Sequence, residues 1–109
     1  MTTQTLKLIS VLVSEGMDKD WYGLELSKRA GLGPGTIYPQ LKRLLVAGWL
    51  ERRWEEIDPV EEGRPRRRLY RLTGAGESAA RAALDEHLAL LQRADAPSVG
   101  TPRPGLGLA

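Results

Sequence analysis

The chain has 109 residues, a length that fits one domain. It contains no cysteine, which excludes a disulfide scaffold and a zinc site built on thiolates. The net charge of +2 is modest, no apolar run approaches the roughly 20 residues needed to span a bilayer, and the start lacks a signal-peptide pattern. We therefore expect a cytoplasmic protein without a membrane partner.

A helix is predicted over residues 4–15, with Gly16 as its stop. Its apolar stripe is wide, so we expect it to face both the core of its own subunit and a partner. The stripe consists of Leu6, Leu8, Ile9, Leu12 and Val13.

A second helix is predicted from Trp21 to Ala30. An acid before it, Asp18 or Asp20, can cap its first turn. Gly31-Leu32-Gly33 then makes a short turn. The residues of this helix that fall on one face at i, i+4 and i+8 are Tyr22, Leu26 and Ala30.

A third helix is predicted to end near Ala47, before Gly48. Pro34 can begin it, because the missing N–H costs nothing in a first turn. Pro39 would then remove an internal hydrogen bond, so we expect a start nearer Thr36 or a loosened first turn. The expected buried face is Ile37, Leu41, Leu44 and Leu45, and the outer face carries Thr36, Tyr38, Pro39, Gln40, Lys42 and Arg43.

Two strand-like runs, residues 49–57 and 67–72, flank a Gly/Pro-containing loop and predict a β-hairpin. Residues 51–62 hold six acids, whereas residues 63–73 hold five arginines and no acid. A solvated hairpin with offsetting charges is one interpretation. The abrupt change of sign at the turn favours the other, a tip that faces phosphate and a side that faces away.

Thr73 is placed to cap a final helix that extends to about Ala94. This helix is too long and too apolar on one side to lie alone in water, so we expect it to pack against a second subunit. Its stripe consists of Ala79, Ala80, Ala83, Leu84, Leu88, Leu90 and Leu91.

The order of elements predicts a mainly α fold with a small β-hairpin, that is, a winged helix-turn-helix. We divide the chain into a DNA-binding domain over residues 1–73, a dimerisation helix over 74–94 and a disordered Pro/Gly tail over 95–109. The third helix would enter the major groove of duplex DNA while the hairpin reaches phosphates or the minor groove. On that helix, Thr36 and Tyr38 are placed to touch bases or backbone, and Lys42 and Arg43 to grip phosphate.

Other chemistries find little support, and we expect neither an enzyme nor a cofactor. Gly31-x-Gly33-x-Gly35 follows a helix and lacks the spacing of a dinucleotide-binding loop. His87 is the only histidine and has no cysteine to join in a metal cluster. The acid pairs Glu55-Glu56 and Glu61-Glu62 lie in a hairpin that we expect to be solvated, with nothing to tune their pKa values.

Three runs occur in the order and spacing of one family. They are Tyr22-Gly23-Leu24-Glu25-Leu26, then Pro34-Gly35-Thr36-Ile37-Tyr38-Pro39-Gln40-Leu41-Lys42-Arg43-Leu44, then Gly63-Arg64-Pro65-Arg66-Arg67. Over roughly residues 6–90 the chain resembles the PadR family of bacterial transcriptional regulators, in its short subgroup with a single C-terminal helix.

The resemblance implies a dimeric winged helix, usually a repressor, held together by its N-terminal and C-terminal helices. It accounts for Pro39, which the family carries in its recognition helix, whereas Trp21 stands where the family often has His. By the same likeness, DNA would be met by Thr36, Tyr38, Lys42 and Arg43 from the recognition helix and by Arg64, Arg66 and Arg67 from the wing.

We therefore expect a homodimeric, sequence-specific repressor on a pseudo-palindromic operator in double-stranded DNA. Two alternatives stay open: a winged-helix protein-interaction module, and a sensor of the same fold gated by a small-molecule effector. Trp21, Trp49 and Trp54 could line a pocket for a flat ligand, although such residues more often lie in a core or at an edge. The last helix contains no aromatic residue, which disfavours a flat effector held there between subunits.

Overall fold

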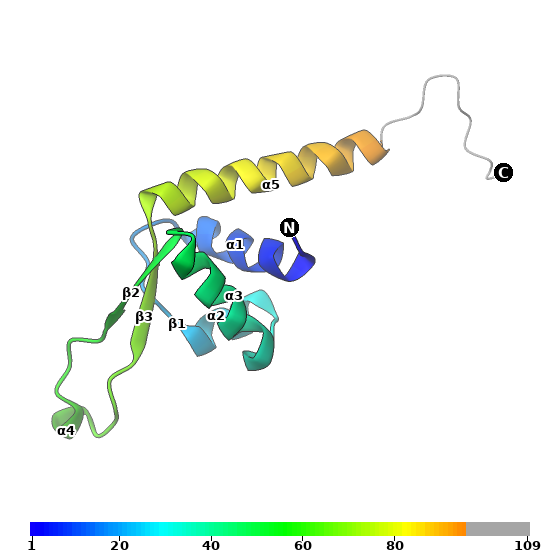
Figure 1. Ribbon diagram of the computed structural model, residues 1–109. Helices are drawn as coiled ribbons and strands as arrows, with labels where there is room; N and C mark the ends of the chain where they lie inside the picture. Colours follow the sequence, from blue (N-terminus) through cyan, green and yellow to red (C-terminus); the bar gives the residue numbers. More distant parts are fainter. Residues whose placement is uncertain (96–109) are drawn as a thin grey trace, which may run out of the picture.

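The computed structural model describes residues 1–95, so the tail expected over residues 95–109 lies outside the described residues except for Asp95, which ends the last helix. The predicted fold class is confirmed: the chain is mainly helical, with one small antiparallel sheet whose strands lie in the order β1-β3-β2 (Figure 1). The elements are α1 (Thr3–Glu15), β1 (Trp21–Tyr22), α2 (Gly23–Ala30), α3 (Pro34–Val46), β2 (Leu50–Trp54), α4 (Pro59–Glu62), β3 (Arg68–Leu72) and α5 (Gly74–Asp95).

The first helix forms where the apolar spacing predicts it. The Thr2 hydroxyl caps its start by accepting from the Thr5 N–H at 3.2 Å, and Gly16 ends it with a φ of 83°. The core lies where α1, α2, α3, the sheet and the base of α5 meet, and removing its apolar side chains from water is the main term that stabilises the fold. Its fully buried members are Leu8, Ile9, Leu12, Trp21, Leu26, Ile37 and Ala80.

A tight turn joins α2 to α3 and fixes how the two helices cross. Gly31 adopts a left-handed conformation with a φ of 68°, and the Leu32 N–H donates to the Ser27 carbonyl at 2.9 Å. This pattern satisfies the last carbonyls of α2 and needs glycine at its left-handed position. The helix-turn-helix is therefore built by the residues that predicted it.

The start of α3 differs from the expectation. The helix begins at Pro34 rather than near Thr36, so Pro39 lies inside it. Pro39 has no N–H to donate to the Gly35 carbonyl four residues earlier. That carbonyl lies at an exposed position, where water can donate a hydrogen bond to it instead. Gln40, expected on the outer face, is buried and accepts a hydrogen bond from the Thr5 hydroxyl at 2.8 Å.

The second helix also starts later than the sequence predicts. Trp21 and Tyr22 form a two-residue strand that pairs with Tyr70 and Leu69 of β3, and α2 begins at Gly23. The Tyr22 N–H donates to the Glu25 carboxylate at 3.3 Å, which caps α2 from inside its first turn. Neither Asp18 nor Asp20 fills that place.

The hairpin of β2 and β3 extends away from the helices, and α4 lies at its tip (Figure 1). This short helix was not predicted, although its signals stand in the sequence. The Asp58 carboxylate caps it through the Val60 N–H at 3.0 Å, Pro59 occupies its first turn, and Gly63 ends it with a φ of 68°.

The last helix, α5, starts from the end of β3, lies across α1 and continues past it (Figure 1). Thr73 caps it as predicted, accepting from the Gly76 N–H at 2.9 Å. Half of its apolar stripe stays in contact with water: Leu88, Leu90 and Leu91 are about 50% exposed. Within residues 1–95, no helix has the length and hydropathy that a membrane span requires.

Candidate nucleic-acid interface

The predicted residues of α3 lie along its outward side. Tyr38, Lys42 and Arg43 are exposed, and Thr36 is half-buried in the first turn. Tyr38 and Lys42 line one hollow together with Arg52 of β2. Lys42 and Arg43 line a second hollow along the same helix with Pro39. The structure therefore brings an aromatic hydroxyl and two cations together on one solvent-facing helix.

Tyr38 is positioned by α2. Its ring lies so close to Gly23 that a Cβ there would stand 2.6 Å from Tyr38 Cε1 and 2.8 Å from its Oη. Glycine leaves this space free, whereas a Cβ at this position would require the Tyr38 ring to shift. The hydroxyl end of Tyr38 is thus held near the start of α2, while about half of the side chain remains exposed.

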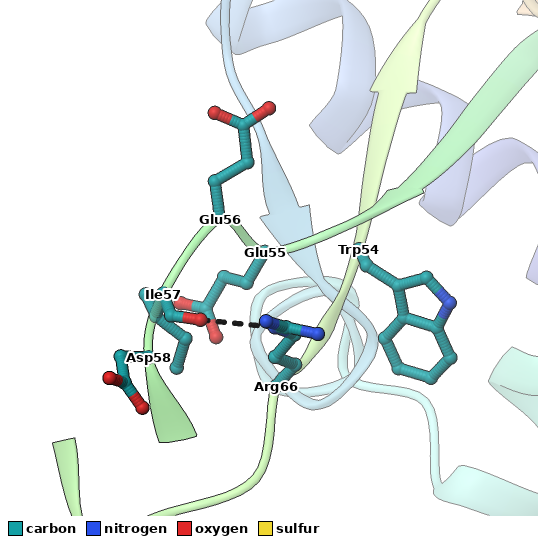
Figure 2. A pocket seen from close by; sticks show the side chains of 6 residues that line it. All are labelled: Trp54, Glu55, Glu56, Ile57, Asp58 and Arg66. Carbon is teal, nitrogen blue, oxygen red and sulfur yellow. Dashed lines mark hydrogen bonds between the residues drawn. The ribbon is translucent and has the colours of Figure 1, made fainter. Parts of the chain in front are cut away.

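Arg66 and Arg67 present their side chains from the wing. Arg66 is exposed, and its Nε donates to the Ile57 carbonyl at 3.0 Å, so that the guanidinium lies between Ile57 and the Trp54 ring (Figure 2). The Arg67 guanidinium lies 4.6 Å from the centroid of the Tyr22 ring. These contacts orient both guanidinium groups, and both side chains remain exposed and accessible to an anionic partner.

Arg64 lies differently from its two neighbours. Its Nη1 and Nη2 donate to the two oxygens of Glu55 at 2.7 and 2.9 Å, a bidentate ion pair. Glu55 was expected in a solvated hairpin with nothing to tune its pKa, and that expectation is wrong. The hydrogen bonds from Arg64, with others from the Arg67 N–H and the Tyr22 hydroxyl, outweigh burial and lower the pKa of Glu55 to about 2. The same pairing raises the pKa of Arg64.

A second acid holds two cations of the strands. Asp20 accepts from Arg71 Nε at 2.9 Å and from Arg53 Nη2 at 2.7 Å. Partial burial opposes ionisation of Asp20, but the hydrogen bonds from Arg71 and Arg53 prevail and lower its pKa. The loop before β1, which sequence reasoning assigned to helix capping, thus ties together β2 and β3.

Two cations near the predicted residues were missed. Arg52 lines the hollow of Tyr38 and Lys42. Side chains two positions apart in a strand lie on the same face, so Leu50, which points towards the core, predicts that Arg52 lies on the side of the sheet next to the helices. Lys28, in the last turn of α2, lines a further hollow with Tyr22 and Arg67. No short-range pattern announces Lys28, because α2 and β3 are distant in sequence.

The ion pairs separate the cations of this face into two groups. Across residues 1–95, Arg53, Arg64 and Arg71 have carboxylate partners within 4 Å. The cations of α3 and the wing that form no ion pair in this part of the chain are Lys42, Arg43, Arg52, Arg66, Arg67 and Arg68. This second group leaves a positive surface suited to phosphate.

The three tryptophans do not line a common pocket. Trp21 is fully buried in the core, Trp49 is half-buried and Trp54 lies on the exposed wing under the Arg68 guanidinium, 4.0 Å from its ring centroid. Trp54 borders a shallow apolar hollow with Pro59, Pro65 and Arg66. Among the described residues, no group of His, Asp and Glu is arranged to hold a metal ion.

Comparison with solved structures gives related folds over most of the chain. The smu.1704 protein of Streptococcus mutans UA159 is 27% identical, with a TM-score of 0.66 over 84% of this chain and 85% of that one. A PadR-like transcription factor from Bacteroides fragilis is 26% identical, with a TM-score of 0.64 over the same two shares. A PadR family regulator from Clostridium difficile R20291 is 23% identical, with a TM-score of 0.64 over 84% of this chain and 96% of that one.

No curated protein matches the sequence. The model of the transcriptional regulator PadR-like family matches residues 16–82, which span α2, the turn, α3, the wing and the first part of α5. This match confirms the resemblance carried by the Tyr-Gly, Pro-Gly-Thr and Gly-Arg-Pro runs. The chain belongs to the PadR-like family of transcriptional regulators.

Proposed function

We propose that the protein is a homodimeric repressor that binds a pseudo-palindromic operator in double-stranded DNA. The observation that carries the proposal is the segregation of charge described above: cations without a carboxylate partner gather on α3 and the wing. A phosphate backbone is the partner that such a surface attracts, with release of counterions. The family of regulators to which the chain belongs supports the same reading.

In this arrangement α3 lies in the major groove. Thr36 and Tyr38 face base edges or the adjoining backbone, and Lys42 and Arg43 contact phosphates. Arg66 and Arg67 reach the backbone or minor groove from the wing, and Arg52 joins the phosphate contacts at the hollow that it shares with Tyr38. Arg64 belongs to the same wing, but both of its terminal nitrogens are engaged by Glu55.

The exposed half of α5 supports the dimer. Leu84, Leu88 and Leu91 follow at i, i+4 and i+7, and the latter two are about half exposed in the single chain. An apolar stripe of this kind on a helix of 22 residues is stabilised by packing against a second copy. Two recognition helices would then meet successive major grooves about 34 Å apart.

Repression is the mode of regulation that the resemblance to the family implies. A dimer that occupies an operator overlapping a promoter excludes polymerase from it. A small-molecule effector would act by weakening DNA binding, and quenching of tryptophan fluorescence by a ligand that also releases DNA would support the gated sensor. A protein-docking module would instead show no affinity for duplex DNA even at low salt.

The test is fluorescence anisotropy with labelled DNA from upstream of the protein's own gene and with a scrambled duplex, across a salt series. Tighter binding to the upstream DNA at physiological salt supports a sequence-specific regulator that controls its own gene. Equal binding to both duplexes that collapses with salt contradicts specificity for that DNA. Absence of binding at low salt overturns the proposed function and favours the docking module.

A further inference from the structure

We infer that Arg64 is a positioning residue of the wing, clamped on Glu55, and that the phosphate contacts of the wing come from Arg66 and Arg67 instead. The inference rests on the proposed DNA-binding function and revises the expectation that all three arginines meet DNA. It also gives a role to Glu55, to which sequence reasoning assigned none.

The Glu55 carboxylate collects hydrogen bonds from three separate parts of the chain. It follows β2 directly, at the point where the regular ladder with β3 ends. Its partners are Arg64 through Nη1 at 2.7 Å and Nη2 at 2.9 Å, the Tyr22 hydroxyl at 3.1 Å and the Arg67 N–H at 3.1 Å. One side chain thus joins β1, the end of β2, the loop after α4 and the start of β3.

Backbone hydrogen bonds add to these side-chain contacts around Glu55. The Glu55 N–H donates to the Arg67 carbonyl at 2.9 Å, and the Arg64 N–H donates to the Pro59 carbonyl at 3.2 Å. Glu55 and Arg67 are therefore linked in both directions. These two hydrogen bonds fix the direction in which the side chains of Arg66 and Arg67 leave the hairpin, because Arg67 takes part in both bonds and Arg66 directly precedes it.

Burial makes the ion pair hard to exchange for a phosphate. The Glu55 side chain is only 10% exposed, and that of Arg64 is 29% exposed. If Arg64 turned towards DNA, it would leave a largely buried carboxylate without its main counter-charge, which is costly. The low pKa of Glu55 keeps that carboxylate ionised at neutral pH. Arg66 can turn towards a phosphate without leaving a charge unpaired, because its Nε donates to a neutral carbonyl.

The two possible roles of Arg64 predict opposite signs for one substitution. Glu55→Gln removes a negative charge from the wing, so simple electrostatics predicts tighter DNA binding if Glu55 merely withholds Arg64 from phosphate. If Arg64 and Glu55 brace the wing, the same substitution weakens binding because the fork is lost. A weakening of about ten- to a hundredfold is the scale expected for hydrogen bonds to a charged group.

The experiment compares variants of the full chain with a labelled non-specific duplex across a salt series. They are Glu55→Gln, Arg64→Lys and Arg64→Gln, with Arg66→Lys and Arg66→Gln as matched controls. Arg64→Lys keeps the positive charge but cannot form the bidentate fork. Circular dichroism and thermal unfolding confirm that each variant is folded.

If Arg64 and Glu55 brace the wing, Glu55→Gln and Arg64→Lys both weaken binding, and Arg64→Gln weakens it by a factor similar to that of Arg64→Lys, because neither replacement forms the bidentate fork. Arg66→Gln lowers the slope by about 0.9, the value of one phosphate contact, while Arg66→Lys preserves it. Tighter binding of Glu55→Gln, or a slope lowered by about 0.9 in Arg64→Gln with Arg64→Lys near wild type, overturns the inference.

A measurement without DNA separates this inference from the proposed function. Amide hydrogen exchange followed by NMR should be faster at the Glu55 and Arg64 N–H groups in Arg64→Lys than in wild type, and unchanged in Arg66→Lys. Equal exchange in all three proteins overturns the brace. If wild type binds no duplex at low salt, the proposed function fails, and the exchange rates still decide whether Arg64 braces the wing.

Discussion

The ring of Tyr38 on α3 packs against the bare α-carbon of Gly23 at the start of α2, in a space that a methyl group would fill. A Cβ at Gly23 would approach Tyr38 Cε1 to 2.6 Å. The Tyr-Gly run at the start of α2 and Tyr38 of α3 therefore belong to one packing arrangement, although α2, the turn and the first turn of α3 lie between them.

Gly23→Ala is expected to displace the Tyr38 ring. The clashing atoms are the far end of a half-exposed side chain, so we expect a loss in the free energy of unfolding well below the value of about 1–3 kcal/mol that overpacking a core costs, measured by urea denaturation. We also expect weaker discrimination between operator and random DNA. Gly35→Ala, where a Cβ meets nothing within 4 Å, is the control for stability. A Gly23→Ala protein with unchanged stability and discrimination would show that the ring moves aside at no cost.

Tyr38→Ala is expected to lower the ratio of operator affinity to random-DNA affinity, because Tyr38 is an exposed aromatic hydroxyl near the N-terminal end of the recognition helix. Lys42→Ala, in contrast, should weaken both affinities equally and flatten the salt slope. Anisotropy titrations with both duplexes provide the comparison. An unchanged ratio in Tyr38→Ala would remove this residue from the specificity determinants.

Gly76→Ala is expected to be the most damaging glycine substitution in the described chain. A Cβ at Gly76 would lie 2.0 Å from the backbone carbonyl oxygen of Trp49, and backbone cannot rotate aside as a side chain can. We expect a loss of at least about 3 kcal/mol, or failure to fold, seen in thermal unfolding. Gly74→Ala, two residues earlier with nothing within 4 Å, should be close to wild type. Equal stabilities for the two variants would contradict the packing of α5 on the Trp49 backbone, just before β2.

Replacing Leu88 and Leu91 by Gln is expected to dissociate the proposed dimer. Each leucine is about half exposed in the single chain, so its burial at an interface contributes roughly 1 kcal/mol. Sedimentation equilibrium should reveal a dissociation constant raised by at least about tenfold. Leu24→Gln, which changes a similarly exposed leucine on α2, should leave the association unchanged. A monomeric wild type, or dimers that persist in the double variant, would move the interface away from α5.

The stability that Glu55 contributes should depend on acid pH. Its pKa is lowered from the ordinary value of 4.5 to about 2 in the folded protein, with Arg64 as the main cause. A lowered carboxyl pKa stabilises the fold at pH values above the unfolded pKa, and this contribution disappears as the pH falls towards the folded pKa. The difference in unfolding free energy between wild type and Glu55→Gln should stay constant from neutral pH to about pH 5 and shrink below it. A difference that is flat down to about pH 2 would mean that the ion pair does not form.

Local patterns were sufficient for the elements whose stabilising contacts are close in sequence. The apolar spacing of α1, the Gly31 turn and the Thr73 cap all depend on residues a few positions apart, and the hairpin is marked by two strand-like runs on either side of a Gly/Pro loop. The face of α3 that carries Tyr38, Lys42 and Arg43 follows from the same helical period.

Two errors are local, the missed helix α4 and the start of α3 at Pro34, and the others concern contacts between distant residues. β1 exists because Trp21 pairs with Tyr70, and Asp20 binds Arg71, 51 residues along the chain. Gln40 is buried because Thr5 of α1 supplies its hydrogen bond. Periodicity gives no information about such partners, so a polar residue next to an apolar stripe was assigned to solvent.

The base of α5 is attached to the end of the recognition unit. The Thr73 hydroxyl donates to the Gly48 carbonyl at 2.7 Å, and its N–H donates to the Trp49 carbonyl at 2.9 Å, directly after α3. A helix of 22 residues is about 33 Å long, so it acts as a lever arm on that attachment. In the proposed dimer, a tilt of a few degrees where the two α5 helices cross would shift the two α3 helices by a few ångström relative to each other. The crossing of α5 would thereby determine which operator spacing the dimer fits, at positions far from any base that it touches.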